Sequence, residues 1–293
     1  MPPAIDEDGV KVDSFAIEET ACDVIAIGNQ KGGVSKTTTT VHLAAALGEI
    51  GRRVLIVDMD SSTGATSALG VGEIFEGTCE VMLGAVPLTE VILRGHEQDE
   101  MTLPRGVDLV CGRRNLEHLE GDIREKNKFA DPANTLGREL QKIADQYDYV
   151  LLDTAPNTNL PTRACYEVAR WFLIASMPQQ LAVEGIQAAI SDLASVREHR
   201  NPSIELLGVV MNCVDGRRTR ASIQQIEHVQ AGLPEDAGLF SVIERTTKVS
   251  QAQQLGRTIL ETDPEHKVTG QFRRLAAEVE DRIQRRAPRL GVV

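Results

Sequence analysis

The sequence lacks any apolar run long enough to cross a membrane. A membrane-spanning helix needs roughly 20 consecutive apolar residues, and the longest run in these 293 residues is far shorter. The first residues, MPPAIDEDGVKVDSFAIEETACD, also lack the basic start and apolar centre of a signal peptide. We therefore expect a cytoplasmic protein that makes no use of a membrane.

Paired cysteines are also missing. The chain has five cysteines and no C-x-x-C spacing among them, which argues against a disulfide framework or a zinc site. A reduced, cytoplasmic protein fits this pattern. We expect all five to be small buried hydrophobic residues: Cys22, Cys79, Cys111, Cys165 and Cys213.

Positive charge is scarce over the chain as a whole. There are 31 Lys and Arg residues against 43 Asp and Glu residues, a net charge of −12. This balance disfavours diffuse binding of nucleic acid over the whole surface. Residues 213–293 differ, because they hold 13 basic and 11 acidic residues. A local basic face in the C-terminal third is compatible with that count.

Short apolar runs alternate with longer stretches of helical periodicity. The runs predict buried strands at 24–28, 54–58, 107–111, 149–153, 171–176 and 206–212, and the periodic stretches predict helices at 37–50, 134–146 and 181–200. Strands that are apolar on both faces and separated by helices are typical of parallel sheets. The sequence therefore predicts an α/β fold, with a single doubly wound, mostly parallel sheet flanked by helices.

No linker, repeat or low-complexity tract divides the chain. Residues 1–22 are strongly acidic, and we expect them to form a flexible N-terminal tail. Residues 23–293 then make one domain. Within it, residues 70–106 are less regular, and we expect an excursion from the sheet there.

A glycine-rich turn joins the first predicted strand to the first predicted helix, in the sequence IGNQKGGVSKTTTTVHL. Backbone N–H groups of such a turn, at the N-terminus of a helix, bind phosphate. The common pattern G-x-x-x-x-G-K-[ST] places glycine at two positions where this chain has Gln30 and Ser35. The expected phosphate-binding residues are Gly32, Gly33, Val34, Ser35, Lys36, Thr37 and Thr38.

Two side chains of this turn have specific expected roles. Lys36 is expected to place its charge between the β- and γ-phosphates, and the hydroxyl of Thr37 to bind Mg²⁺. Ser35 costs about 1–2 kcal/mol if its backbone must be left-handed. A chance glycine-rich turn without a ligand is the alternative interpretation.

Aspartates end two of the predicted strands. Asp58 and Asp60 lie at the end of RVLIVDMD, and Asp153 ends YDYVLLD. The carboxyl ends of parallel strands border the ligand crevice. Asp153 is predicted to hold Mg²⁺ through a water, and Asp60 to orient the attacking water. Each alone could instead cap the next helix, but together, in this order after the turn, they indicate a nucleotide site of the P-loop NTPase type.

Four motifs resemble the ParA group of partition ATPases, which belong with MinD in the deviant Walker A class: KGGVSKTTTT, VLIVDMD, YVLLDTAP and MNCVDGRRTR. The resemblance implies an ATPase that uses ATP and Mg²⁺. It implies catalytic roles for Lys31, Lys36 and Asp60, and metal binding by Thr37 and Asp153. In the family, a lysine at the position of Lys31 reaches across an ATP-bridged homodimer to the partner's phosphates.

The resemblance also implies the base pocket and the partners. Asn212 and the segment after Phe240, which includes Arg245, match the residues that line the adenine pocket. The implied partners are non-specific double-stranded DNA and a ParB-like centromere-binding or adaptor protein, with localisation on the nucleoid in the ATP state. The residues expected to bind DNA are Arg217, Arg218, Arg220, Arg245 and Lys248. Taken singly, each of these is more simply a solvated surface charge.

The chain departs from the family pattern after the second strand. The family usually has D-x-D-P-Q-G-N, where this chain has DMDSSTG at 58–64. Glu244 and Thr246 stand where the family has proline and asparagine. Slow, partner-stimulated hydrolysis is the expectation for the family.

Three other functions are compatible with the same turn. A partition ATPase moves a plasmid or chromosome, but the same type of ATPase could instead position a protein compartment such as a carboxysome. A MinD-like membrane regulator needs an amphipathic C-terminal helix, and EDRIQRRAPRLGVV has no clean apolar face. An iron–sulfur reductase like the nitrogenase iron protein needs a cysteine soon after the strand that ends at Asp153, whereas Cys165 lies 12 residues beyond it.

Overall fold

The computed structural model describes residues 4–5, 11–12, 22–72, 74–95, 103–126, 131–178, 182–216, 220–233 and 238–286. Most of the expected N-terminal tail, 1–22, lies outside these residues. Two of its short pieces are described, β1 (Ala4–Ile5) and β2 (Lys11–Val12), and they pair antiparallel. The flexibility of the tail stays a prediction.

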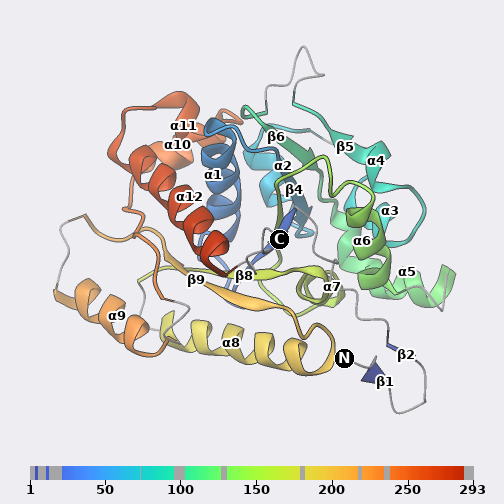
Figure 1. Ribbon diagram of the computed structural model, residues 1–293. Helices are drawn as coiled ribbons and strands as arrows, with labels where there is room; N and C mark the ends of the chain where they lie inside the picture. The colour runs from blue at the N-terminus through green and yellow to red at the C-terminus, as the bar shows by residue number, and fades with distance from the viewer. Residues whose placement is uncertain are drawn as a thin grey trace, which may run out of the picture.

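Seven strands form one sheet in the order β5-β6-β4-β7-β3-β8-β9 (Figure 1). All neighbouring strands pair in parallel except β5 and β6. The predicted doubly wound, mostly parallel sheet is therefore confirmed. The strands are β3 (Asp23–Gly28), β4 (Val54–Met59), β5 (Ile92–Leu93), β6 (Val107–Val110), β7 (Tyr149–Thr154), β8 (Trp171–Ser176) and β9 (Glu205–Met211).

The strand β5 corrects one expectation. The stretch 70–106 was expected to leave the sheet, but Ile92 and Leu93 return to it and pair with Leu109 and Val110. A two-residue antiparallel strand at the edge of a sheet gives too short an apolar run to be recognised in the sequence.

Helices cover both faces of the sheet, with a separate apolar core on each face (Figure 1). Alternate residues of one strand serve the two cores, and this explains the continuous apolar runs. One core contains α1 (Lys36–Glu49), α2 (Gly64–Ala68), α11 (Ile259–Thr262) and α12 (Lys267–Arg286), with α10 (Thr247–Gln254) packed against it. The other contains α3 (Thr78–Met82), α4 (Leu88–Val91), η1 (Arg114–His118), α5 (Leu119–Lys126), α6 (Pro132–Gln141), α7 (Leu160–Val168), α8 (Ala182–His199) and α9 (Arg220–Ala231). Within the described part of the chain, no helix is long and apolar enough to cross a membrane.

His42 fastens α1 to the C-terminal helices. Its ring is fully buried and stacks on Phe272, with 4.6 Å between ring centroids. Nδ1 lies 2.9 Å from the carbonyl oxygen of Thr38, and Nε2 lies 3.3 Å from the backbone N–H of Ile259. One neutral tautomer satisfies both bonds, with Nδ1–H donating and Nε2 accepting. Burial lowers the pKa of His42 to about 4.

This arrangement makes the stability depend on pH. The unfolded chain takes up a proton on His42 near pH 6.5, whereas the folded protein resists it down to about pH 4. Stability is therefore fully present above pH 6.5 and is lost as the pH falls from 6.5 to 4, by roughly 3 kcal/mol. In urea unfolding at pH 7.5 and pH 4, His42→Gln should lose less stability than the wild type by about that amount. Equal losses in the two proteins would contradict this account of His42.

Candidate functional site

The turn between β3 and α1 is anchored by Asn29, whose role the sequence alone does not indicate. Its side chain is 2% exposed. Its Nδ2 donates to the carbonyl oxygen of Ala175 at 2.8 Å, and its Oδ1 accepts from the backbone N–H of Lys31 at 3.0 Å. Asn29 thus ties the start of the turn to the end of β8 and fixes the backbone of Lys31. No feature of the local sequence distinguishes this role from that of an ordinary turn asparagine.

The backbone of the turn is accessible at its two glycines. Gly33 has a positive φ of 72°, and a Cβ added there would meet no atom within 4 Å. A Cβ added at Gly32 would meet only Pro156, at 3.9 Å. The N-terminus of α1 lies directly beyond. Accessible backbone N–H groups at a helix N-terminus can bind a phosphate group.

Ser35 adopts the conformation that makes its side chain costly. It has φ 69° and ψ 30°, in the left-handed region, where a residue with a Cβ is disfavoured by about 1–2 kcal/mol. The strain is held in place because the carbonyl oxygen of Ser35 accepts from the N–H of Thr39 at 2.9 Å and from its hydroxyl at 2.7 Å. The departure from glycine at this position is therefore accommodated with strain rather than avoided.

Lys36 is a buried ammonium at the start of α1, 7% exposed. Its Nζ donates to the carbonyl oxygen of Lys31 at 3.4 Å, which is long for such a bond. Burial lowers the pKa of Lys36, and the carboxylates of Asp153 and Asp60 oppose that shift. With three donors and one long contact in the described structure, Lys36 retains capacity to bind an anion.

Asp153 lies at the end of β7, fully buried, and two hydroxyls of α1 hold it. Thr37 Oγ1 donates to Oδ2 at 2.8 Å, and Thr40 Oγ1 donates to Oδ1 at 3.0 Å. Burial raises the pKa of Asp153, and the neighbouring Asp58 raises it further, against the two hydroxyls and Lys36. The structure thus brings together Thr37 and Asp153, two oxygen donors of the kind that Mg²⁺ prefers.

Asp58 organises the loop that follows β4. Its Oδ2 accepts from the N–H and the hydroxyl of Thr66 at 2.9 and 2.7 Å, and its Oδ1 accepts from the N–H of Asp60 at 3.2 Å. The helix-capping interpretation therefore describes Asp58 well. Asp60 is 9% exposed, and its Oδ1 accepts from the N–H of Ser62 at 2.9 Å. Thr63 in the same loop has a left-handed backbone, with φ 57°.

Asn212 presents an unpaired acceptor. The hydroxyl of Thr39 already donates to Ser35, so it can only accept from Asn212 Nδ2, which lies at 2.8 Å. This fixes the amide orientation and leaves Asn212 Oδ1 buried with no hydrogen-bond partner. Such a group costs roughly 1–3 kcal/mol. A ligand that supplies a donor here would remove that cost.

Cys213 follows Asn212 and corrects the expectation that all five cysteines are buried, because it is only half-buried. Its backbone is left-handed, with φ 54°, and its Sγ lies 3.8 Å from Ser35 Oγ. The turn after β9 thus approaches the phosphate-binding turn. The other four cysteines are buried, as predicted.

The predicted DNA-binding residues are only partly described. Arg217 and Arg218 lie outside the described residues, and only the backbone of Arg220, the first residue of α9, is described. Arg245 is exposed, and its N–H donates to the carbonyl oxygen of Val214 at 2.8 Å. Lys248 on α10 lies 3.7 Å from Asp263 and is half exposed. DNA binding by this set stays a prediction.

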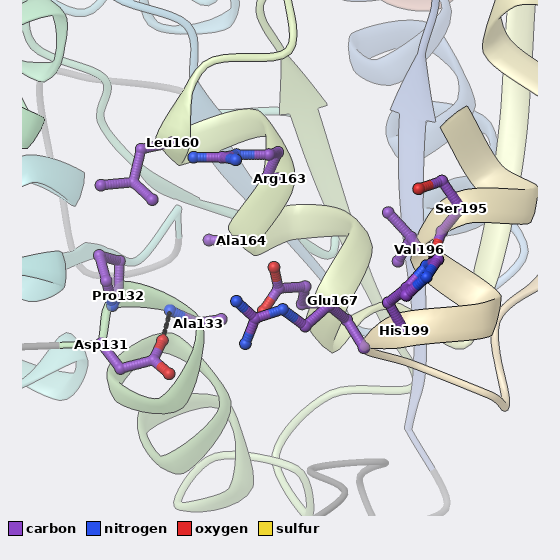
Figure 2. Close-up of a pocket in the computed structure, with 11 residues that line it drawn as sticks. Asp131, Pro132, Ala133, Leu160, Arg163, Ala164, Glu167, Ser195, Val196 and His199 are labelled. Carbon is purple, nitrogen blue, oxygen red and sulfur yellow. Dashed lines mark hydrogen bonds between the residues drawn. The ribbon is translucent and has the colours of Figure 1, made fainter. Parts of the chain in front are cut away.

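A separate hollow of ≈ 480 Å³ lies between α6, α7 and α8 (Figure 2). These helices cover the other face of the sheet from α1. It combines acidic and basic side chains, among them Asp131, Glu167 and Arg163. Burial raises the pKa of Glu167, and Arg200 and Arg163 oppose that shift. None of the predicted site residues lines this hollow.

Known proteins similar to this chain in sequence and in fold include nucleotide-binding proteins by their names. Residues 22–206 match the protein family described as AAA domain. The chain is 34% identical over 262 residues to the chromosome-partitioning ATPase Soj of Thermus thermophilus, covering 89% of this chain and 96% of that protein. It is 30% identical over 259 residues to the sporulation initiation inhibitor protein Soj of Bacillus subtilis, covering 87% and 97%. The solved structure of cobyrinic acid a,c-diamide synthase from Mycobacterium smegmatis with bound ADP and magnesium is similar in fold. Its TM-score is 0.71, with 26% identity, over 87% of this chain and 93% of that one.

The left-handed backbone of Ser35 leads to a stability prediction. Ser35→Gly removes the Cβ that disfavours this conformation, so it should stabilise the folded protein without nucleotide by about 1 kcal/mol. Ser62→Gly is the matched control, because Ser62 is not among the residues with a left-handed backbone. Glycine there should lower the stability of the folded protein slightly. Thermal melting of the three proteins provides the measurement. A lower melting temperature for Ser35→Gly than for the wild type would show that the strain is not there.

Proposed function

The chain belongs to the ParA-type P-loop ATPases, and we propose that it is a DNA-partitioning ATPase whose ATP-bridged dimer binds DNA. The observation that carries this proposal is the pairing of Thr37 and Asp153 below an open phosphate-binding turn. Relatives named as Soj match most of the chain at 34% and 30% identity.

The nucleotide is ATP, with Mg²⁺. The open backbone of Gly32 and Gly33 receives the phosphates, and Lys36 contributes its ammonium donors. The Thr37 hydroxyl and the Asp153 carboxylate would hold the metal. When bound, Mg²⁺ withdraws charge from the phosphate oxygens. The unpaired Asn212 Oδ1 would accept from the amino group of the base. Arg245 lies close by in the chain fold, because its N–H donates to the carbonyl oxygen of Val214.

Hydrolysis depends on two further residues. Asp60, in the loop that Asp58 holds, orients the attacking water. Lys31 has its backbone fixed by Asn29, and its side chain completes the phosphate site of the partner subunit. A lysine supplied from the partner makes dimerisation depend on the γ-phosphate. Turnover is slow, and a ParB-like protein accelerates it and so releases the dimer.

Dimerisation also explains the switch in DNA binding. A few lysines and arginines that contact phosphates give weak, salt-sensitive, non-specific binding. Doubling such a set in a dimer raises the effective affinity strongly. We assign this role to Arg245 and Lys248, together with Arg217, Arg218 and Arg220. The dimer then coats the nucleoid, and its release moves a plasmid or chromosome.

The test is binding to non-specific duplex DNA without nucleotide, with ADP and with ATP·Mg²⁺. The wild type should bind only with ATP·Mg²⁺. Lys31→Ala should lose DNA binding by on the order of 100-fold while still binding ATP, and Arg245→Ala/Lys248→Ala should lose it by a similar factor at ATP concentrations that saturate the variant. The matched control is Arg124→Ala/Lys142→Ala, which removes the same charge from exposed ion pairs on the other face.

The outcomes separate the parts of the proposal. If the control variant lost DNA binding equally, the loss in Arg245→Ala/Lys248→Ala would be explained by net charge alone. Wild-type protein that ignores DNA in every nucleotide state would overturn the DNA-partitioning function, although not ATP binding.

A further inference from the structure

Residues 238–245 run beside β9 almost as another strand. The N–H of Phe240 donates to Val209 O at 2.9 Å, and the N–H of Ile243 donates to Met211 O at 2.9 Å. The N–H of Val214 donates back to Ile243 O at 3.0 Å. These bonds use the backbone groups on one side of the segment.

Side chains of α12 bind the other side of the same segment. Gln271 Oε1 accepts from the N–H of Glu244 at 2.8 Å, and Glu278 accepts from the N–H of Ser241 at 2.7 Å and from its hydroxyl. Arg282 donates to the carbonyl oxygen of Gly238 at 2.8 Å. The helix thus satisfies backbone groups that a neighbouring strand would otherwise bind.

These side chains form one stripe, which we call the α12 stripe: Lys267, Gln271, Glu278 and Arg282. Their spacing of four and seven residues places them on one face of a helix. Lys267 pairs with the Glu244 carboxylate at 2.6 Å, and the Arg282 guanidinium lies 3.8 Å from the ring centre of Phe240. The stripe meets the segment in antiparallel order, so α12 fixes its register as well as its distance.

The segment in turn holds the residues that carry Asn212. Ile243 bonds to Met211 on one side of Asn212 and to Val214 on the other. Between these bonds, Cys213 keeps a strained left-handed backbone. Strain of that kind persists only where the surroundings fix it. Asn212 also bonds directly, through its N–H to Ser176 O at 2.7 Å and through Nδ2 to Thr39. Residues 241–244 and α12 add the support that holds the backbone on either side of it.

We propose that Gln271 and Glu278 are positioning residues for base selectivity. By holding the segment 238–245 they keep Asn212 Oδ1 where it accepts from the amino group of adenine. Guanine has a carbonyl oxygen in the corresponding place, so the same geometry sets two acceptors against each other. The inference rests on the proposed function, because it takes the base to lie beside Asn212. It adds that base selectivity depends on α12, although the α12 side chains contact the segment 238–245 and not the base.

The test compares the binding of ATP, GTP and inorganic tripolyphosphate by calorimetry. Gln271→Met keeps the length and removes the acceptor, and Glu278→Gln keeps one acceptor for two donors. Arg273→Met is the matched control, since Arg273 is on α12 but pairs with Glu49 on α1 instead of the segment. Gln271→Met should bind ATP roughly tenfold more weakly and lose most of its preference over GTP. Glu278→Gln should lie between it and the wild type.

Tripolyphosphate is the probe that separates positioning from folding. It uses the phosphate-binding turn alone, so all variants should bind it as the wild type does. Variants that lose tripolyphosphate equally would show a general structural defect and overturn the inference. Unchanged ATP affinity and selectivity in Gln271→Met would overturn it as well. If the wild-type protein bound none of ATP, GTP and tripolyphosphate, that result would instead contradict the proposed function.

Discussion

The buried carboxylate of Asp153 joins the sheet to α1, because the hydroxyls of Thr37 and Thr40 both donate to it. It lies at the end of β7, between β3 and β4 at the centre of the sheet. An isolated carboxylate is very costly in an apolar core, so this end of the sheet is stable only with α1 docked above it. Docking of α1 then places the phosphate-binding turn. The raised pKa of Asp153 has the same origin, because burial and the neighbouring Asp58 both disfavour its charge.

Strain concentrates around this carboxylate. Across the described residues, the non-glycine residues with left-handed backbones are Ser35, Thr63 and Cys213. Each lies in a different turn, after β3, β4 and β9, and all three turns border the candidate site. Hydrogen bonds hold Ser35 through Thr39, and hold Thr63 through Asp60 and Ser67. Backbone strain persists where the surrounding structure fixes it, and it clusters at binding sites.

Much of the fold followed from the sequence, because parallel strands buried on both faces appear as uninterrupted apolar runs. The six predicted strands correspond to the parallel strands of the sheet, whereas β5 was too short to be recognised. The sequence also indicated Thr37 and Asp153, since strand ends of a parallel sheet converge. It did not indicate Asn29, Gln271 or Glu278. Their roles depend on partners far along the chain, and their types are ordinary for a turn or an exposed helix face. The left-handed conformation of Ser35 likewise could be established only from the backbone of the folded structure.

In the proposed site, Thr37 and Asp153 together hold the metal that accompanies ATP. The most direct measurement is ATP affinity with and without Mg²⁺, in the wild type and in Thr37→Val, which keeps the shape and removes the hydroxyl. Without Mg²⁺ the two proteins should bind ATP alike, because Thr40 still donates to Asp153 in the variant and keeps α1 in place. Mg²⁺ should tighten binding at least roughly tenfold in the wild type and hardly at all in the variant. An equal gain from Mg²⁺ in the two proteins would show that Thr37 does not hold the metal.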